Sequence, residues 1–213
     1  MHKYVKIETP YERDMHGTKK LIEGVFRNET VEYLQNNTWS WTEKIDGTNI
    51  GIVWDGHNVQ FQGRTEQAQI PAPLANRLNE LFSGNETEEL FEQMFGGSQV
   101  ILFGEGYGRK IQKVGSLYLP DRVDFILFDV YFPENNLWLR RESVVEIAEA
   151  FGLTYVPEIM TGTIADAVRF VKTHPQSTIG TAPMEGLVGR PAVELMNRRG
   201  ERVIVKVKTK DYE

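Results

Sequence analysis

Cysteine is absent from this 213-residue chain, which excludes disulfide bonds, thiol catalysis and thiolate-bound metal. Histidine is sparse, and its four copies are His2, His16, His57 and His174. No two of them stand at metal-ligand spacing, which argues against a structural zinc site. Long apolar runs are also lacking, since no stretch approaches the ~20 residues that span a bilayer. The first residues have no apolar signal-peptide core, so we expect a cytoplasmic protein with no membrane association.

An excess of positive charge is lacking as well, because 24 Lys and Arg stand against 30 Asp and Glu, a formal net charge of -6. Proteins dedicated to nucleic-acid binding are usually basic. An enzyme that engages nucleic acid transiently needs only a local basic surface. Two candidates for such a surface are Arg109, Lys110 and Lys113, and the alternating Lys206, Lys208 and Lys210. For the first group, a solvated face on an acidic protein is the alternative.

The composition is sufficient for a folded core, with 40% hydrophobic and 11% aromatic residues. Residues 39–64 follow the pattern strand, turn, strand, turn, strand. Apolar residues at helical spacing predict helices over residues 73–82, 85–95, 141–151 and 163–174. Further strands are expected at residues 99–104, 123–132, 185–190, 193–196 and 202–208. Antiparallel strand pairs with helices inserted between them indicate the α+β class.

The stretch Lys44-Ile45-Asp46-Gly47 lies between two of these strand patterns. Asp46-Gly47 falls where a tight connection is expected, and Lys44 would then project from a strand end. A lysine held on a rigid element can act as a nucleophile when its amine is neutral. The alternative is a hairpin that carries a surface lysine.

Five further short motifs follow in order along the chain. They are Gly63-Arg64-Thr65, residues 102–108 (LFGEGYG), residues 125–130 (FILFDV), residues 184–190 (MEGLVGR) and Val205-Lys206-Val207-Lys208. Together with the lysine motif, the series resembles the covalent nucleotidyltransferase superfamily of ATP-dependent ligases and mRNA-capping enzymes. The nearest likeness is to phage-type RNA ligases, and it spans Thr42 to Lys208.

The resemblance implies a nucleotidyltransferase, ATP-grasp-like ligase fold in which antiparallel sheets with flanking helices enclose the nucleotide. It also implies a single adenylation domain over residues 1–213. Only residues 209–213 follow the last motif, so we expect no C-terminal OB or helical domain.

Two of the motifs can be interpreted from their residues alone. Lys206 and Lys208 stand two apart on an expected strand, so both would point to one face while Val205 and Val207 point inward. That face is either solvent or an anion site. Glu185 supplies a carboxylate suited to a hard metal such as magnesium, and the glycine after it would let a ligand approach the backbone closely.

The family likeness assigns roles to the remaining candidates. Lys44 would be the nucleophile, its neutral form favoured by Lys206 and Lys208, which would also bind the α-phosphate. Glu105 would contact the ribose, Arg64 the ribose or a phosphate, and Glu43 the adenine. Asn49, expected on the same strand as Lys44, would lie near the phosphate and metal. Phe128 would stack on adenine, although simple alternation places it with Ile126 and Val130 and leaves a core role open.

The implied activity is that of an ATP-dependent RNA ligase. AMP would pass from Lys44 to the 5′-phosphate of a nicked or broken RNA, and a 3′-hydroxyl would then displace it, with Mg²⁺ or Mn²⁺ as cofactor. The location would be the host cytoplasm if a phage encodes the chain. The alternatives are a DNA ligase, a capping guanylyltransferase, and a non-catalytic nucleotide- or RNA-binding module.

Overall fold

The computed structural model describes residues 1–213, and the chain folds into two compact units. Unit 1 comprises Met1–Val5 and Asp46–Val156, and unit 2 comprises Lys6–Ile45 and Pro157–Glu213. Both contain antiparallel sheets with flanking helices, which confirms the expected α+β class. A single domain over the whole chain stays a prediction. No helix is both long and apolar enough to cross a membrane.

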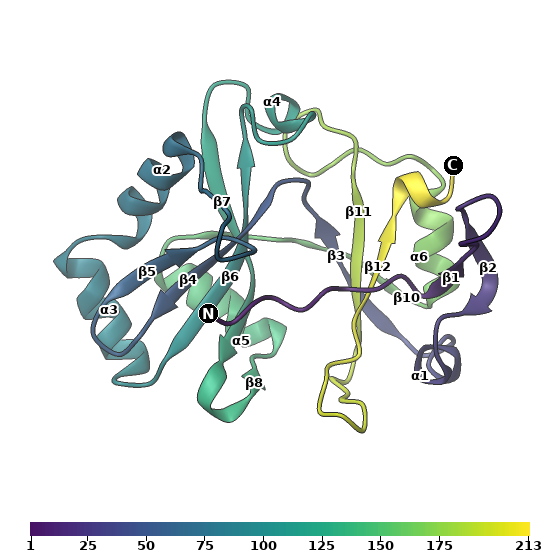
Figure 1. The fold of residues 1–213 in the computed structure, drawn as a ribbon, viewed down its shortest axis with the longest axis horizontal. Helices are drawn as coiled ribbons and strands as arrows, with labels where there is room; N and C mark the ends of the chain where they lie inside the picture. Colours follow the sequence, from purple (N-terminus) through teal and green to yellow (C-terminus); the bar gives the residue numbers. More distant parts are fainter. The chain divides into compact units, whose positions relative to one another are not determined.

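Unit 1 is built on a sheet with strand order β5-β4-β6-β7-β8, and β9 pairs in parallel with β7 (Figure 1). The strands are β4 (Thr48–Trp54), β5 (Val59–Gln62), β6 (Val100–Gly108), β7 (Val123–Phe132), β8 (Leu137–Trp138) and β9 (Thr154–Tyr155). The helices are α2 (Ala72–Phe82), α3 (Asn85–Phe95), α4 (Gly115–Tyr118), the 3₁₀ turn η1 (Pro133–Asn135) and α5 (Arg141–Ala150).

The core of unit 1 lies where α2, α3 and α5 cover one face of this sheet. Leu74, Leu78 and Phe82 recur every four residues along α2, and all three are fully buried. From α3, Phe91 stacks on Trp54 of β4 with ring centroids 5.4 Å apart. The helices predicted from apolar spacing are therefore confirmed, with the first one starting a residue earlier than expected.

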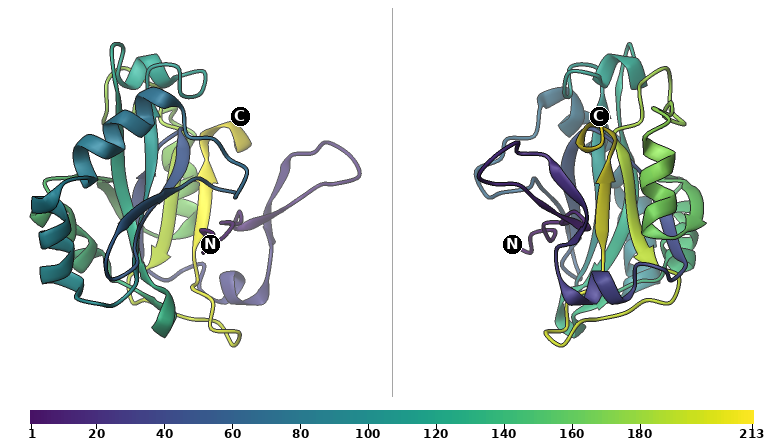
Figure 2. Two further views of the ribbon diagram at one scale, coloured as in Figure 1. Left: turned by 60° about the vertical axis from the view of Figure 1, so that its left-hand side comes forward. Right: turned by 90° about the vertical axis from the view of Figure 1, so that its right-hand side faces the viewer.

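Unit 2 is built on a sheet with strand order β10-β3-β11-β12, backed by α6 (Figures 1 and 2). Its strands are β1 (Tyr11–Arg13), β2 (Leu21–Phe26), β3 (Trp39–Lys44), β10 (Glu158–Gly162), β11 (Gly186–Pro191) and β12 (Val205–Lys208). Its helices are α1 (Glu29–Tyr33), α6 (Ile164–Val171) and the 3₁₀ turn η2 (Thr209–Asp211). The strands β1 and β2 form a separate antiparallel pair.

The core of unit 2 is centred on Trp39 and Trp41, which stack at 5.8 Å and are fully buried. Each indole N–H is satisfied by a backbone carbonyl, that of Leu34 and that of Gly162 respectively. The helix α6 begins with a capping box in which Thr163 and Asp166 bond each other's backbone N–H. This cap fixes the start of α6 where the sequence predicted it.

The strands on either side of Asp46-Gly47 do not form a hairpin. The strand β3 pairs with β10 and β11, whereas β4 pairs with β5 and β6 in a different sheet. The hairpin alternative for the lysine motif is therefore wrong. The expectation that Asn49 shares a strand with Lys44 is wrong for the same reason, because Asn49 lies on β4. A local sequence pattern identifies a strand but not its partner.

Two expected strands differ from the observed ones. Residues 193–196 form no strand and make only an isolated bridge, Met196 to Arg202. The strand β6 continues through Gly104-Glu105-Gly106-Tyr107-Gly108, a run we expected to be a loop. Glycine weakens strands in isolation, but here both neighbouring strands pair along the run and hold it extended.

Candidate functional site

Lys44 and Lys208 in unit 2 share one carboxylate, that of Glu185. Lys44 Nζ lies 2.8 Å from Glu185 Oε2, and Lys208 Nζ lies 3.1 Å from Oε1. The strand register explains the arrangement, because Gly186 on β11 is the direct partner of both lysines on the flanking strands. The three side chains are 15–26% exposed, so the ion pairs are partly shielded from water.

The alternation expected for the last motif is confirmed. Val205 and Val207 are buried in the core of unit 2, and Lys206 and Lys208 are half-buried on the opposite face of β12. The two lysines have different electrostatic surroundings. Burial lowers the pKa of Lys206, and the charges of Lys208 and Lys44 lower it further. Burial also acts to lower the pKa of Lys208, but the charge of Glu185 and its hydrogen bond outweigh burial and raise that pKa.

Gly186 serves the packing of strands rather than the approach of a ligand. Its φ is +156°, and a Cβ built on it would lie 2.2 Å from the carbonyl oxygen of Val207. The close approach that the sequence suggested at this glycine is thus made by the backbone of β12. A side chain at this position would push β11, which begins directly after Glu185, away from β12, which carries Lys208.

Glu43 is held by a neighbouring segment of unit 2. Its side chain is 1% exposed, and its carboxylate accepts hydrogen bonds from the hydroxyls of Ser177 and Thr178. The backbone N–H of Thr178 also donates to it, at 3.1 Å. These bonds satisfy the buried charge and anchor residues 177–178 to β3. A role for Glu43 as an adenine contact stays a prediction.

In unit 1, Asn49 and Glu105 are direct partners across the β4–β6 ladder. Both are half-buried. Gly47 packs against β6 beside Glu105, because a Cβ on Gly47 would fall 2.2 Å from the carbonyl oxygen of Gly106 and 2.8 Å from Glu105 Cγ. The glycine of the lysine motif therefore allows the chain to pass close to β6. The ribose and phosphate roles of Glu105 and Asn49 stay predictions.

Phe128 is the extra residue of a β-bulge in β7 and lies outside the core cluster of unit 1. Phe103 pairs with Asp129 and the next residue, Gly104, pairs with Leu127, so Phe128 is the extra residue. The bulge changes the alternation, and Val130 lies in the unit 1 core cluster whereas Phe128 does not. The core role left open by the sequence is thereby disfavoured.

A tyrosine near the start of the chain covers this part of the sheet, and no sequence signal pointed to it. The ring of Tyr4 makes edge contacts with Phe103, Phe128 and Trp138 at centroid distances of 5.1, 5.0 and 5.4 Å. Its hydroxyl donates to the buried carboxylate of Asp129 at 2.8 Å. Tyr4 therefore fixes the orientation of Phe128, the residue expected to stack on adenine.

Arg64 lies in the exposed loop after β5. Its neighbours Gly63 and Thr65 line a hollow of about 440 Å³, whose wall also includes Gln60 and Gln62 of β5. A side chain at the rim of a polar hollow can reach a bound molecule, although the ribose or phosphate contact stays a prediction.

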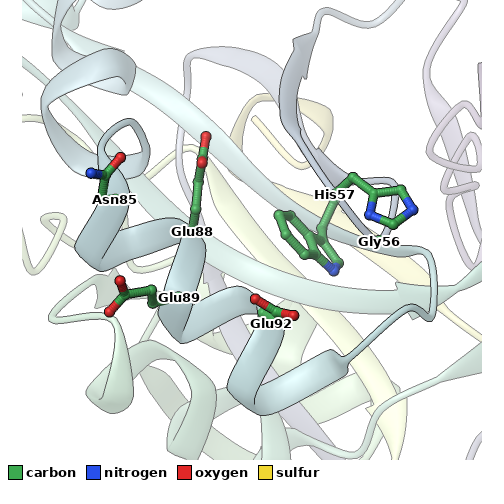
Figure 3. A pocket seen from close by; sticks show the side chains of 7 residues that line it. Gly56, His57, Asn85, Glu88, Glu89 and Glu92 are labelled. Carbon is green, nitrogen blue, oxygen red and sulfur yellow. The ribbon is translucent and has the colours of Figure 1, made fainter.

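A second hollow of unit 1, of about 280 Å³, is acidic (Figure 3). Figure 3 shows Glu88, Glu89 and Glu92 on α3 opposite the turn that carries His57. Carboxylates repel phosphates, so this hollow is unsuited to a nucleotide. Within residues 1–213, no group of three or more His, Cys, Asp or Glu side chains could hold a metal by itself.

The sequence matches the RNA ligase family over residues 37–208. That range is most of the chain and contains the site residues predicted from the motifs, from Glu43 to Lys208. The chain therefore belongs to the RNA ligase family. No curated protein sequence matches it.

Solved structures of an RNA ligase from Naegleria gruberi share the fold. A variant with ATP and Mn aligns with a TM-score of 0.64 and 18% identity, covering 97% of this chain and 61% of that one. A variant with AMP and Mn gives 0.65 and 18%, covering 97% and 62%. The same ligase with PPi gives 0.65 and 18%, covering 98% and 62%. The chain thus spans about three fifths of the length of these structures, and the likeness establishes the nucleotidyltransferase fold alone.

Proposed function

We propose that the chain is an ATP-dependent RNA ligase in which Lys44 forms a covalent lysyl-adenylate. The observation that carries the proposal is the placement of Lys44 and Lys208 on the two oxygens of Glu185. A lysine at a strand end, beside further cations that can bind phosphate, suits an amine nucleophile acting on a nucleotide. Membership of the RNA ligase family supports the same conclusion.

In the first step, Lys44 Nζ loses a proton and attacks the α-phosphorus of ATP. A nitrogen–phosphorus bond forms, the bond from the α-phosphorus to the bridging oxygen breaks, and pyrophosphate leaves with its electron pair. Lys206 and Lys208 would bind the α-phosphate and offset the negative charge that develops there. The pKa of Lys206 is lowered first by burial and then by the charges of its cationic neighbours Lys208 and Lys44.

In the later steps, the AMP moves from protein to RNA. An oxygen of the RNA 5′-phosphate attacks the phosphorus bound to Lys44, which restores the free amine. A 3′-hydroxyl then attacks the RNA 5′-phosphorus, forming the phosphodiester and releasing AMP. Both steps need two ends held in line rather than a new nucleophile on the protein.

Glu185 is the residue that would hold a divalent metal, Mg²⁺ or Mn²⁺. The chain has no cage of three acidic ligands, but Mg²⁺ at nucleotide sites commonly uses one or two carboxylates together with substrate phosphates and water. A single partly exposed carboxylate fits that donor set. When bound, the metal would neutralise charge on the phosphates.

The remaining candidates would recognise the nucleoside. Glu105 would contact the ribose, Arg64 the ribose or a phosphate, and Phe128 the adenine ring. The position of Phe128 at the bulge, outside the core cluster, and its contact with Tyr4 support the last role. Asn49, opposite Glu105 on the sheet, would lie near the phosphate and metal.

The decisive experiment is incubation with α-labelled ATP and magnesium, followed by denaturing electrophoresis. We expect an acid-labile protein–AMP adduct in the wild type and in Lys3→Ala, which removes an exposed lysine. The adduct should be absent in Lys44→Ala. A wild type that binds ATP without labelling would instead indicate a non-catalytic binding module.

The polynucleotide and the nucleotide are tested separately. Joining should be faster on an all-RNA nick than on mixed or all-DNA nicks, and a preference for DNA would favour the DNA ligase alternative. Labelling with GTP in place of ATP would favour a capping guanylyltransferase.

A further inference from the structure

The segment between β6 and β7 forms a rigid loop, residues 109–122, hereafter the basic loop. Its two ends are joined, because the N–H of Arg109 donates to the carbonyl of Arg122 at 2.9 Å. Inside it, Ile111 is 6% exposed and belongs to the unit 1 core. Tyr118 of α4 is 2% exposed and meets Tyr107 edge-on at 6.0 Å. Two apolar anchors therefore fix the loop from within.

Glycine closes the loop tightly. A Cβ on Gly115 would lie only 2.0 Å from the carbonyl oxygen of Gly108, so the backbone of α4 packs directly on the end of β6. Lys110 and Gln112 adopt left-handed φ values of 64° and 57°, which are costly for residues other than glycine. Such conformations persist only where the surrounding structure enforces them. The backbone of the loop is thus preformed.

The basic loop is also attached to the lysine motif. The hydroxyl of Tyr118 accepts a hydrogen bond from the backbone N–H of Asp46 at 3.2 Å, and Gln112 Nε2 donates to the carbonyl of Gly47 at 2.9 Å. Asp46 follows Lys44 by two residues, so their Cα atoms are at most about 7.6 Å apart by chain geometry alone. The loop is therefore attached to the two residues, Asp46 and Gly47, that follow the proposed nucleophile along the chain.

The side chains of Arg109, Lys110 and Lys113 project from this rigid backbone into solvent. None of them makes an ion pair in the structure of residues 1–213, although the chain has an excess of acidic residues. Some other surface cations are paired, such as Lys172 with Glu23 at 2.7 Å and Arg27 with Glu8 at 3.2 Å. Unpaired cations on a fixed loop present the charge pattern that a polyanion requires.

We propose that the basic loop binds the phosphate backbone of the RNA strand next to the end that is joined. The proposal rests on the ligase function proposed above, because that function makes RNA the substrate of the chain. Backbone contacts position a strand without reading its sequence, so binding should be independent of base composition. The loop would be separate from the α-phosphate site, which is assigned to Lys206 and Lys208.

The test uses the full chain and a mixed-sequence single-stranded RNA with a 5′-phosphate, labelled at its 3′ end. Fluorescence anisotropy gives the Kd at several KCl concentrations without ATP. The variant Arg109→Gln/Lys113→Gln removes two charges and avoids the strained position. The matched control, Arg198→Gln/Arg199→Gln, removes two exposed charges from the loop between β11 and β12, whose side chains also make no ion pair.

For the variant, we expect the slope of log Kd against log salt to fall by about 1.4, or about 0.7 for each RNA phosphate that is no longer neutralised. The Kd at 0.1 M salt should rise on the order of tenfold. The control should change less than about twofold, and both variants should form the lysyl-adenylate at the wild-type rate. A second variant, Lys110→Asn, should weaken RNA binding without strain, since asparagine tolerates a left-handed φ.

Three results would overturn the proposal. Equal weakening in variant and control would mean that only net charge matters. Unchanged RNA affinity with slower adenylation at low ATP would mean that the loop binds the triphosphate. A wild-type protein that does not bind RNA would exclude RNA as the ligand of the basic loop. A wild type that binds RNA through the loop but never labels with AMP would instead refute the ligase function and leave the loop's role intact.

Discussion

Glu185 shows why a single residue in this chain has to be judged by its strand partners. The sequence marks Glu185, Lys44 and Lys208 as separate candidates more than 20 residues apart. The register of β11 with β3 and β12 brings both ammonium groups onto one carboxylate. Without that carboxylate, Lys44, Lys206 and Lys208 would lose a nearby negative charge. Lys44 and Lys208 would also lose the partner that orders their side chains. No periodicity or motif spacing contains this information.

The first residue-scale prediction concerns pH and the two lysines of β12. The pKa of Lys206 is lowered from its usual 10.5, chiefly by burial, so the folded protein binds fewer protons there than the unfolded chain. The charged form of Lys206 therefore lowers the free energy of unfolding, and this destabilisation is lost as the pH rises through the lowered pKa. The pKa of Lys208 is raised: burial opposes the shift, but Glu185 outweighs it. The stability contributed by Lys208 is therefore fully present below pH 10.5 and is lost as the pH rises through the raised pKa.

We expect these signs in the free energy of unfolding from urea titrations at pH 8, 9.5 and 11. Relative to Lys206→Gln, the wild type should gain stability as the pH rises from 8 to 11, because the unfolded chain holds the Lys206 proton up to pH 10.5. Relative to Lys208→Gln, it should lose stability between pH 9.5 and 11. Equal pH dependence in both comparisons would contradict the distinct surroundings of the two lysines.

At the scale of elements, the packing of β11 against β12 sets the geometry of the site. In Gly186→Ala, the new Cβ would lie 2.2 Å from the carbonyl oxygen of Val207, so the strands must separate. We expect a loss of about 1–3 kcal/mol in the free energy of unfolding, as for other overpacked sites. Lysyl-adenylate formation should fall as well, because Glu185 directly precedes β11 and Lys208 lies on β12, the two strands that move.

Gly97→Ala is the matched control for this prediction. Its Cβ would meet nothing within 4 Å, and its φ lies outside the left-handed region. Urea unfolding and the α-labelled ATP assay, applied to both variants, separate a general effect of alanine from the strand packing. Wild-type labelling by Gly186→Ala at saturating ATP would show that the register is not required.

The elements of this fold differ in how far the sequence predicts them. The helices α2, α5 and α6 follow from apolar spacing, because each buries one continuous stripe. The glycine-rich half of β6 could not be predicted, since tertiary pairing overrides its low strand propensity. The bulge at Phe128 cannot be seen in a period-two pattern either, and it separates Phe128 from Val130, which that pattern places on one face.

The sequence predicted the motif residues of the candidate site but not the residues that pack against them. Motifs identified Lys44, Glu185, Lys206 and Lys208 because the chemistry restricts the residue types. Tyr4 belongs to no motif, and its packing against Phe103 and Phe128 depends on a segment that is distant in sequence. Residues that position others through packing can be found only from the structure.

At the scale of the whole molecule, charge acts in two opposite ways on an RNA ligand. The net charge of -6 repels a polyanion at long range. In the proposals made above, the basic loop and the lysines of β12 would attract it at short range. Attraction at close range outweighs the distant field, which is already screened beyond about 10 Å at 0.1 M salt. RNA affinity should therefore be set by a few local interactions.

This balance predicts that ionic strength separates the two halves of the reaction. Adenylation of Lys44 involves one small nucleotide, whereas joining needs a strand held through several phosphates. Raising KCl from 50 to 200 mM should slow joining at subsaturating RNA by about tenfold, because counterion release then favours binding less. Adenylation at saturating ATP should change less than about threefold. Labelling with α-labelled ATP measures the rate of adenylation, and gel analysis of pre-adenylated RNA measures the rate of joining. An equal decline of the two rates would contradict the prediction, because the same charges would then limit both steps.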